Sequence, residues 1–481
     1  MADGQFRRPG DRIIRRRVNP TREISLPAPQ VQRAESPNVR HSAKVFVLAF
    51  AGLVLIGTCL LMLPWTTRSG EPTSWVNALF TATSAASVTG LVVVDTRDHW
   101  NGFGQAVILM LIQSGGLGFM VGASLVLRMI GRGGGVRLRD ALLIQDGAPA
   151  VSLGEAISLS RKIAVFTFAV EAVGALVLAL RFARDMPWHE ALWNGVFHAV
   201  SAFCNAGFDI RGQFQSLAEY RESIWVNVTV MLLIQAGALS YIVLADTAQK
   251  RSWSKLATNS KIVLLFNAIL IGVGFVMFLA VEWGNALADT PVPYRPLVAL
   301  FQSVTTRTAG FATEDFTSLS AFTLFVMIAL MFVGGSSGST AGGVKLQTFG
   351  VVIVAVASTL KGHDEPQMFR RRIGIPLVMR TLAVLVLFFT AHFLVTLGLA
   401  LTEYLFATEP GFQALLFESM SALATVGLST GITPDLSTAG KLLLAAAMFF
   451  GRIGPLTAAY ALQRRQEVRH YRFPEARINI G

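Results

Sequence analysis

Residues 78–91 read ALFTATSAASVTGL, and three later stretches repeat the pattern: GVFHAVSAFCNAGF at 195–208, ALFQSVTTRTAGF at 299–311 and LLFESMSALATVGL at 415–428. Each has a phenylalanine at its third position and a glycine nine or ten residues later, followed by Leu or Phe. The glycines recur at nearly regular intervals along the chain, and they are Gly90, Gly207, Gly310 and Gly427. A segment repeated four times at such spacing predicts four similar structural units in one chain.

The composition is that of a chain that lies in a lipid bilayer. Of its 481 residues, 53% are hydrophobic and only 15% are charged, far from the balance of an ordinary soluble domain. The net charge is +12, but the basic residues fall in short clusters between apolar runs, which argues against a nucleic-acid surface. The sequence contains no Walker-type phosphate loop, no HExxH and no catalytic Ser/His/Asp grouping, so we expect no enzyme activity.

Eight apolar runs are long enough to cross a hydrocarbon core of about 30 Å. They lie near 43–64, 104–130, 162–182, 223–245, 260–281, 320–358, 376–403 and 438–462. The four repeated segments fall inside successive pairs of these runs, and they are too short to cross and too apolar for an aqueous loop. We therefore expect them to enter and leave the membrane on the same side.

Basic residues follow the second run of each pair. They are Arg128, Arg132, Arg137 and Arg139, then Lys250, Arg251, Lys255 and Lys261, then Lys361 and Arg370 to Arg372, and finally Arg464, Arg465, Arg469 and Arg472. Cytoplasmic loops carry an excess of Lys and Arg, so these segments should be cytoplasmic. The Arg-rich stretch before residue 43 has no apolar core of a signal peptide, so both termini are expected in the cytoplasm.

The predicted fold is an all-α membrane protein of four tandem helix–pore loop–helix units with pseudo-fourfold symmetry around a central pore. Each unit crosses twice, so all four share one orientation, unlike the inverted repeats of many secondary transporters. The expected boundaries are a basic cytoplasmic tail at 1–42, pore units at 43–130, 160–246, 260–360 and 376–463, and a cytoplasmic tail at 464–481. The third unit contains a broken second helix at 334–343.

The four repeated segments are suited to selecting a cation. A potassium ion that leaves water needs replacement oxygens, and backbone carbonyls supply them without fixed charge. Glycine permits backbone angles that direct successive carbonyls toward a common axis, and the preceding short helix directs its partly negative C-terminus the same way. The expected K⁺-binding filter residues are Val88, Thr89, Gly90, Asn205, Ala206, Gly207, Thr308, Ala309, Gly310, Thr425, Val426 and Gly427.

The run at 320–358 is nearly twice the length that one span needs, and a glycine- and serine-rich stretch interrupts it. Such residues in succession cannot form a stable helix, because glycine costs about 1 kcal/mol per helical position. A packing surface would use isolated small residues every fourth position, so a gate in the pore is the better interpretation. The expected gate residues are Gly334, Gly335, Ser336, Ser337, Gly338, Ser339, Thr340, Ala341, Gly342 and Gly343, together with Lys345 and Arg452.

Arg452 lies within an apolar run, where a charge costs at least about 2.5 kcal/mol and usually faces a cavity or a partner. The number of residues between Gly427 and Arg452 is nearly the same as that between Gly310 and the start of the gate stretch. Arg452 and the gate stretch should therefore lie at the same depth in the membrane. Its charge would repel cations when the gate is closed. Lys345 is open to two interpretations, a second gate charge or a side chain that reaches toward the interface.

Other polar residues in apolar segments are expected to brace the structure. Glu418, His198 and Arg307 lie within the repeated segments, where buttressing by hydrogen bonds is the favoured interpretation. For Glu171 an interhelical hydrogen bond is preferred over an ion-coupling role. Acidic residues follow every repeated segment, where they would concentrate cations; they are Asp95, Asp98, Asp209, Glu314, Asp315 and Asp435.

The four pore-loop segments, the eight runs and the stretch GGSSGSTAGGVK resemble the Trk/Ktr/HKT superfamily of potassium transporters over nearly the whole chain. The ending FFGRIGPLTAAYAL is most similar to KtrB-type subunits. The resemblance implies a plasma-membrane homodimer, one pore per protomer, on a cytosolic nucleotide-binding (RCK-type, KtrA-like) ring. It implies no cofactor in this chain, K⁺ as the transported ion, Na⁺ as a candidate activator, and ATP or ADP only on the separate regulatory subunit.

Three other functions compete with this interpretation. A sodium-permeable or sodium-coupled relative is the nearest, and Gly90 argues against it, because serine at that position accompanies sodium transport in plant members. A secondary transporter of an organic solute would be built from inverted repeats. A receptor or scaffold would leave the four glycine motifs unexplained.

Overall fold

The computed structural model describes residues 38–118, 153–363, 365–406 and 410–454. These residues are mostly helical, and the strands among them form one antiparallel pair, β1 (Gln367–Met368) and β2 (Arg371–Arg372), with Gln367 opposite Arg372. Most of the predicted N-terminal tail, the predicted C-terminal tail, the arginines at 128–139 and the ends of the predicted spans at 104–130 and 438–462 lie outside the described residues.

The helices fall into four groups in chain order. Group 1 is α1 (Asn38–Leu61), α2 (Trp75–Ser87) and α3 (Gly102–Leu117), and group 2 is α6 (Leu153–Phe182), α7 (Trp188–Cys204), α8 (Ile224–Ala238) and α9 (Tyr241–Lys250). Group 3 is α10 (Thr258–Glu282), α11 (Arg295–Thr305), α12 (Ala321–Phe332) and α13 (Leu346–Leu360), and group 4 is α14 (Ile375–Leu405), α15 (Phe412–Leu423) and α16 (Thr438–Ile453). Short 3₁₀ turns are η1 (Pro64–Thr66), η3 (Ala218–Tyr220), η4 (Trp253–Lys255), η5 (Val292–Tyr294) and η6 (Thr433–Asp435).

Among the described residues, three helices are long and apolar enough to cross a membrane: Ser160–Phe182 within α6, α10 and α14. The pair α8 and α9 makes a fourth if its two bent halves count as one span. Shorter apolar helices occupy Val47–Leu61, Gly102–Leu117, Ala321–Phe332 and Leu346–Leu360. The chain is therefore a helical protein with several apolar helices.

The run predicted as a span over 223–245 is bent in the structure. The helix stops after Ala238, and α9 leaves at an angle of 100° to α8. The carbonyls of Gly237 and Ala238 do not bond to the next turn, because they accept hydrogen bonds from the amides of Thr340 (3.3 Å) and Ser336 (2.8 Å). A distant segment thus ends the helix by taking two of its acceptors. The break predicted within 320–358 is present, between α12 and α13.

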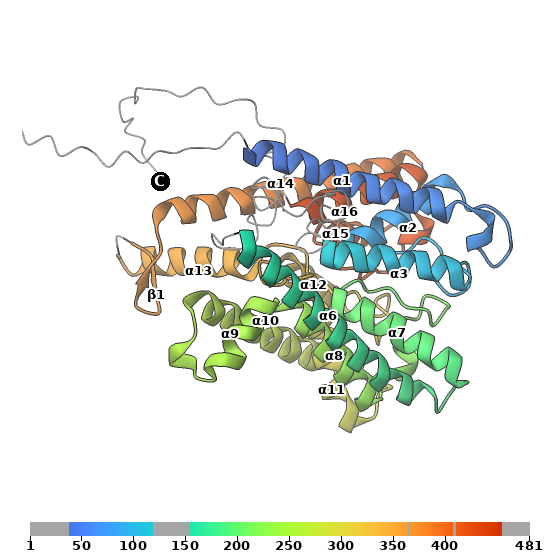
Figure 1. Ribbon diagram of the computed structural model, residues 1–481, viewed down its shortest axis with the longest axis horizontal. Coiled ribbons are helices and arrows are strands. Elements are labelled where there is room, and N and C mark those ends of the chain that lie inside the picture. The colour runs from blue at the N-terminus through green and yellow to red at the C-terminus, as the bar shows by residue number, and fades with distance from the viewer. Residues whose placement is uncertain (1–37, 119–152, 364, 407–409, 455–481) are drawn as a thin grey trace, which may run out of the picture. The chain divides into compact units, whose positions relative to one another are not determined.

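In each group the second helix (α2, α7, α11 or α15) packs against the first, and neighbouring groups contact each other in a closed order. α3 of group 1 contacts α7, α8 contacts α11, α12 contacts α15, and α16 of group 4 returns to α2 (Figure 1). The last contact joins the final group to the first. The helices α2, α7, α11 and α15 therefore each contact both their own group and a neighbouring one.

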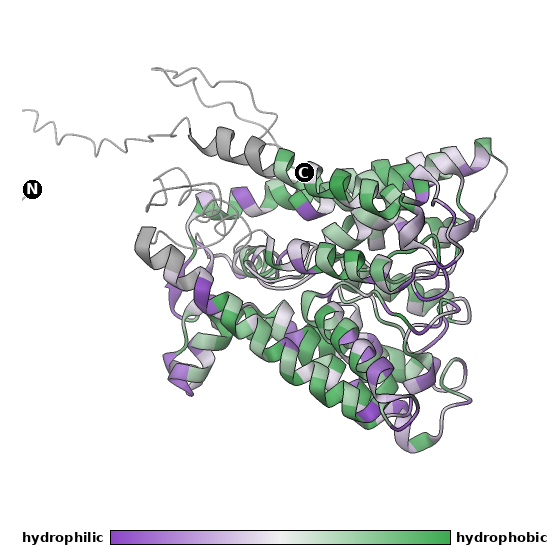
Figure 2. Ribbon diagram, turned by 45° about the vertical axis from the view of Figure 1, so that its right-hand side comes forward, coloured by the Kyte–Doolittle hydropathy of each residue, from purple (hydrophilic) through white to green (hydrophobic). Residues whose placement is uncertain are grey.

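Apolar residues serve both the core and the outer surface. The phenylalanines that begin the repeated motif (Phe80, Phe197, Phe301 and Phe417) are at most 1% exposed. By contrast, α14 exposes Val386, Phe393 and Leu401, which is the pattern of a helix facing lipid. Figure 2 shows apolar residues along the middle of the long helices and polar residues toward their ends and connections.

Two buried glutamates join helices within groups 3 and 4. Glu282, at the end of α10, accepts hydrogen bonds from the amide (3.1 Å) and hydroxyl (2.6 Å) of Ser320, the N-cap of α12. Glu403, in the last turn of α14, accepts the same two bonds from Ser437, the N-cap of α16. A carboxylate at a helix N-terminus satisfies unpaired amides and favours the helix dipole. Each glutamate thus fixes where the following helix begins.

We expect Glu282→Ala to lower the free energy of unfolding by about 3 kcal/mol, because it removes the acceptor of the half-buried Ser320 hydroxyl and of the buried Thr323 hydroxyl. The measurement is the melting temperature of the purified chain in detergent. Glu222→Ala is the control, since the Glu222 side chain is 45% exposed and pairs only loosely with Arg221; it should cost under about 0.5 kcal/mol. Equal shifts for both variants would contradict this role.

Candidate ion pathway

The four repeated segments fold alike at the end of each short helix. In three of them, the residue before the motif glycine donates its N–H to the carbonyl five residues earlier. These bonds are Thr89 to Ser84 (2.8 Å), Ala206 to Ser201 (2.7 Å) and Val426 to Ser421 (2.8 Å), with Ala309 to Thr305 (3.0 Å) as the equivalent one residue shorter. This closing bond is typical of a helix that ends in a left-handed residue.

Each segment contains two left-handed positions, two residues apart. The first has φ between 50° and 60° and is occupied by Val88, Asn205, Thr308 and Thr425. The second is the motif glycine, with φ between 69° and 99°. A β-branched residue with positive φ is strained. Three of the four first positions carry one, so the surrounding contacts must hold this backbone in place.

The four glycines meet one another in chain order. A Cβ added to Gly90 would collide with the carbonyl of Ala206, and one added to Gly427 would collide with the carbonyl of Thr89. A Cβ added to Gly207 would lie 2.7 Å from the Cα of Gly310, and one added to Gly310 would lie 2.6 Å from the carbonyl oxygen of Val426. Each glycine therefore abuts the next loop, and the fourth returns to the first. We call this closed set of contacts the glycine ring. It brings together all four predicted filter segments.

Hydroxyl groups four residues after the motif phenylalanine support the glycine ring, although the sequence pattern alone did not lead us to single them out. Ser84 and Ser421 accept the amide N–H of Gly90 and Gly427, each at 3.1 Å. Ser201 and Thr305 instead donate to the carbonyls of Phe208 (2.7 Å) and Phe311 (2.6 Å). The signal is visible in the four aligned segments, where this position is always Ser or Thr.

Three predicted buttresses lie behind the filter segments. Arg307 is fully buried and donates to the carbonyl of Leu330 in α12 at 2.7 Å. Glu418 accepts hydrogen bonds from the Ser429 hydroxyl (2.6 Å) and the Thr430 amide (2.9 Å), which fixes the loop after Gly427. His198 pairs with the carbonyl of Asn194 at 2.8 Å within its own helix. None of these three side chains bonds to a motif glycine among the described contacts.

The Gly/Ser-rich loop (334–343) lies against the filter segments. The Gly342 amide donates to the Thr308 hydroxyl (3.2 Å), and the Thr340 hydroxyl donates to the Phe203 carbonyl (3.1 Å) and lies 3.3 Å from Asn205 Oδ1. A Cβ on Gly342 would collide with the hydroxyl of Thr425. The loop thus touches the first left-handed residue of three of the four segments.

Two cationic side chains hold the carbonyls of this loop. Arg452 donates to the carbonyl of Thr340 and to that of Gly115 in α3, each at 2.6 Å. Lys345 donates to the carbonyls of Ala341 (2.5 Å) and Gly342 (3.4 Å). Three consecutive loop carbonyls therefore bind a positive charge. Arg452 of α16 thereby joins the loop to α3 of group 1.

Glu171 forms the expected interhelical hydrogen bond. It accepts from Gln113 Nε2 of α3 at 3.1 Å, and the Cys204 thiol lies 3.8 Å away. These contacts join α6, α3 and the end of α7 beside the filter segment of group 2. The preferred interpretation of Glu171 as a helix-packing residue agrees with this geometry.

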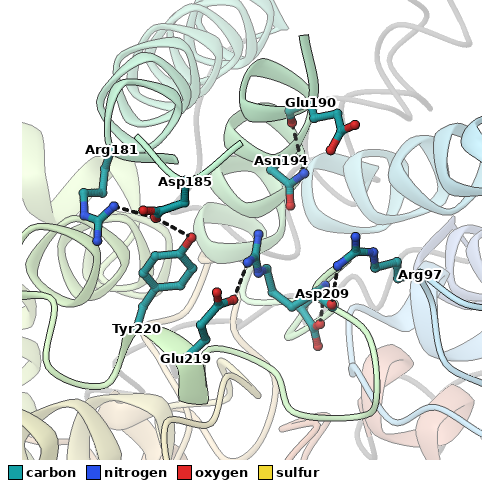
Figure 3. A network of polar contacts seen from close by, with 9 residues as sticks. Arg97, Arg181, Asp185, Glu190, Asn194, Asp209, Glu219 and Tyr220 are labelled. Carbon is teal, nitrogen blue, oxygen red and sulfur yellow. Dashed lines mark hydrogen bonds and ion pairs between the residues drawn. The ribbon is translucent and has the colours of Figure 1, made fainter. Parts of the chain in front are cut away.

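A polar network covers the residues that follow the second filter segment (Figure 3). Asp209 accepts the amide of Arg211 at 2.9 Å, and Arg97 of the preceding segment donates to the Arg211 carbonyl at 2.8 Å. The Arg211 guanidinium pairs with Glu219 and lies 5.1 Å from the centre of the Tyr220 ring. The two post-filter loops are thereby tied to each other.

Several predicted entrance carboxylates are engaged in backbone bonds. Asp95 accepts the amides of Arg97 (2.8 Å) and Asp98 (2.9 Å), and Asp315 accepts that of Thr317 (2.9 Å). Burial raises the pKa of Asp209 to about 6, and burial raises the pKa of Glu314 to about 7. Both groups therefore titrate close to neutral pH, unlike an exposed carboxylate.

The site therefore combines three features. Backbone carbonyls lie around the glycine ring, the Gly/Ser-rich loop packs against the side chains of the filter segments, and acidic residues follow those segments. Oxygen donors without catalytic groups suit the coordination of a hard monovalent cation.

Known proteins agree with this architecture. A family model described as "TrkH: Cation transport protein" matches residues 25–468. The Ktr system potassium uptake protein B of Bacillus subtilis is 37% identical over 443 residues, which cover 91% of this chain and 96% of that protein. The potassium/sodium uptake protein NtpJ of Enterococcus hirae is 35% identical, covering 94% and 99%.

The fold also matches a solved structure, the potassium transporter TrkH from Vibrio parahaemolyticus, with a TM-score of 0.68 at 20% identity, over 90% of this chain and 86% of that one. These relatives are membrane transporters, so the chain is not an enzyme. The match of the family model over most of the sequence, together with relatives at 35% and 37% identity, assigns the chain to the TrkH family of cation transport proteins.

Proposed function

We propose that this chain takes up K⁺ across the plasma membrane as the ion-conducting subunit of a Ktr-type system. The observation that carries the proposal is the glycine ring, in which four backbone segments meet with room for no side chain. Among its relatives, the B. subtilis protein at 37% identity is named a potassium uptake protein.

The proposed architecture is four helix–pore loop–helix units with eight spans, pseudo-fourfold symmetry and both termini in the cytoplasm. The closed order of contacts from α3–α7 to α16–α2 supports it. In this arrangement α8 crosses together with α9 and α12 together with α13, and the helices α2, α7, α11 and α15 direct their C-termini toward one axis.

Selection of K⁺ follows from the backbone conformation of the four filter segments. Two left-handed residues in each segment direct carbonyls inward, so a dehydrated K⁺ meets oxygens from four walls. The helix C-termini add partial negative charge. Hydroxyls near the ends of α2, α7, α11 and α15 hold this geometry; they belong to Ser84, Ser201, Thr305 and Ser421. Conduction then draws on the ion gradient and the membrane potential.

The Gly/Ser-rich loop is the proposed gate, with Arg452 and Lys345 as the charges that hold it closed. Arg452 bonds to the loop and to α3, so it holds group 3 against group 1. Its charge also disfavours a cation beside the closed loop. Opening requires that the bond between Arg452 and the loop breaks.

Sodium transport is the second candidate, because NtpJ, 35% identical, is named for potassium and sodium. Gly90 favours potassium. We further propose a homodimer on a cytosolic RCK-type nucleotide-binding ring, with ATP or ADP on that ring and Na⁺ as activator. The relatives' designation as parts of a Ktr system supports additional components.

We expect Gly310→Ser to reduce K⁺ flux into liposomes by about tenfold or more and to weaken discrimination against Na⁺. Residue 310 has a backbone φ of +78°, which strains any residue other than glycine, and a side chain there would meet the Val426 carbonyl. Each increase of about 1.4 kcal/mol in the barrier slows flux tenfold. The readout is ⁸⁶Rb⁺ and ²²Na⁺ uptake by the reconstituted chain. Gly272→Ser is the control, because a Cβ there meets nothing within 4 Å. Equal fluxes for both variants would overturn the filter assignment.

Deleting residues 336–341 or introducing Arg452→Ala should raise K⁺ flux, by about tenfold for the arginine variant, since two charge-assisted bonds are lost. Arg380→Ala, at an exposed position of α14, controls for loss of a positive charge. A folded Arg452→Ala chain that conducts less than the parent would show that the arginine supports conduction instead.

External acidification should reduce uptake by about twofold or more. The pKa of Asp209 is raised to about 6, so its negative charge is present at neutral pH and is lost as the pH falls through that value; Glu314 responds earlier. Uptake is measured from about pH 7.5 to about pH 5 with Asp209→Asn, which should flatten the lower part of the profile, and with Glu190→Gln as an exposed control. A profile unchanged by Asp209→Asn would remove this residue from the entrance.

A further inference from the structure

The connection between α13 and α14 is strongly basic. Residues 361–374 carry four cationic side chains and two acidic ones. Three of the cationic residues are consecutive, Arg370, Arg371 and Arg372, and all three are exposed on the β1–β2 hairpin at the end of α13 (Figure 1). Arg372 pairs with Glu365 at 3.4 Å. Among the described residues, Arg370 and Arg371 have no acidic partner, so the hairpin presents positive charge that is not compensated.

The turn of this hairpin has a strained backbone. Met368 pairs with Arg371, so the turn consists of the two residues between them, Phe369 and Arg370. Both have a positive φ, 51° for Phe369 and 60° for Arg370. Two-residue turns with positive φ at both positions favour Asn-Gly, and larger residues are strained there. Contacts made by the hairpin must therefore hold the turn in this conformation.

Aromatic and polar contacts supply this support. The ring centres of Phe369 and Trp253 lie 6.2 Å apart, edge to face, and Lys261 Nζ lies 5.6 Å from the centre of the Phe369 ring. The Gln367 amide donates to Ser358 Oγ of α13 at 3.3 Å. Phe369 is thus fixed against the protein, and the arginines that follow it have a defined position.

The same contacts bring a second basic stretch to the hairpin. Residues 250–261 contain no acidic residue and four cationic ones, which are Lys250, Arg251, Lys255 and Lys261. Lys250 pairs with Asp246 at 2.6 Å. Arg251 and Lys255 lie within two residues of Trp253, the residue that contacts the hairpin. Residues 250–261 and 361–374 therefore form one cationic surface, which we call the hairpin patch.

Exposed apolar residues border the hairpin patch. Leu360, the last residue of α13, is 83% exposed, and Ile375, the first residue of α14, is 44% exposed. Leu377, Met379 and Trp253 are each about half exposed. In a membrane protein, exposed apolar residues of this kind face lipid, and tryptophan gathers at the membrane–water interface. The arginines therefore lie at the level of the lipid headgroups.

We propose that the hairpin patch binds the headgroup of an anionic phospholipid in the cytoplasmic leaflet. Clusters of basic residues directly beside a membrane-spanning helix on its cytoplasmic side are suited to anionic headgroups. Arg370 and Arg371 carry planar guanidinium groups, which pair with phosphate oxygens through two N–H donors. The acyl chains lie along Leu360 and Ile375. The inference goes beyond the proposed uptake function and rests only on the proposed orientation of the chain.

The apolar border favours a lipid over a protein as the occupant. An acidic surface of a soluble protein would compensate the charge of Arg370 and Arg371 but would leave the neighbouring Leu360 and Leu377 without an apolar partner. A phospholipid matches both features, because its phosphate and its acyl chains belong to one molecule. The order of charged and apolar residues along the chain is therefore that of a lipid site.

A lipid at this place has a mechanical consequence. α13 begins directly after Lys345, next to the Gly/Ser-rich loop, and ends at the connection that carries the hairpin. The hairpin bonds to Ser358 in the last turns of α13. A lipid held by the hairpin therefore anchors one end of the helix whose other end joins the proposed gate.

The test counts the lipids that bind to the purified full-length chain. Native mass spectrometry in detergent compares dioleoyl phosphatidylglycerol with dioleoyl phosphatidylcholine, which have the same acyl chains. The chain should bind phosphatidylglycerol about tenfold more tightly, and Arg370→Gln/Arg371→Gln should remove most of this preference, because each basic residue near an anionic headgroup adds to the attraction. Inorganic phosphate at the same concentration should not displace the lipid, since it has no acyl chains.

Two further variants separate a defined site from diffuse charge. Arg161→Gln/Lys162→Gln removes the same charge from exposed positions of α6 and should leave the preference unchanged. Phe369→Gly keeps every charge and relieves the strained turn, but it removes the ring that packs on Trp253, so it should weaken phosphatidylglycerol binding by about threefold. Equal losses for the two double variants, or unchanged binding by Phe369→Gly, would overturn the defined site in favour of diffuse attraction.

The remaining outcomes separate the lipid site from the uptake function. Equal affinity for the two lipids, or a preference that survives Arg370→Gln/Arg371→Gln, overturns the lipid site, makes an acidic protein surface the better occupant and leaves the uptake function standing. Displacement by inorganic phosphate overturns the phospholipid in favour of a free anion. Absence of K⁺ flux from liposomes overturns the uptake function and leaves a measured lipid preference intact.

Discussion

The structure depends on the close approach of four backbones at the glycine ring. A side chain at any of the four glycines would collide with the neighbouring segment, so every segment must reach this place in its left-handed conformation. That conformation is costly for Val88, Thr308 and Thr425. The closing bond at the end of each short helix and the Ser or Thr hydroxyl behind it offset the cost. The surrounding helices then hold the short helices at a fixed distance, with buried phenylalanines as spacers.

The Gly/Ser-rich loop also depends on the direction of its backbone carbonyl and amide groups. The carbonyls before the motif glycines lie against the neighbouring segments, whereas the loop directs its own carbonyls toward Arg452 and Lys345. Its N–H and O–H groups then face the filter side chains. A segment of small residues is needed, because Gly334, Gly335 and Gly342 each lie where a Cβ would meet backbone or a filter side chain.

The sequence predicted those parts of the site that glycine and repetition mark. The four segments meet at the glycine ring, and the interruption of the third unit lies against them. Of the polar residues singled out, Arg452 binds the loop, whereas Arg307 bonds to Leu330 of α12 and Glu418 to Thr430 after the fourth segment. The bend after Ala238 was not predictable, because its cause is a hydrogen-bond donor in a distant part of the sequence, and the residues around it are apolar and suited to helix. Glu282 and Glu403 were overlooked for a related reason: a charge at the end of an apolar run resembles any boundary residue until its partner serine is known.

The bend between α8 and α9 links helix continuity to the position of the loop. The carbonyls of Gly237 and Ala238 accept the loop amides of Thr340 and Ser336, and buried carbonyls do not remain unpaired. If the loop were withdrawn, these acceptors would have to take water or the amides of Tyr241 and Ile242, the partners they would have in a straight helix. Withdrawal of the Gly/Ser-rich loop of group 3 would therefore exchange hydrogen bonds with group 2 at the point where α8 ends and α9 begins.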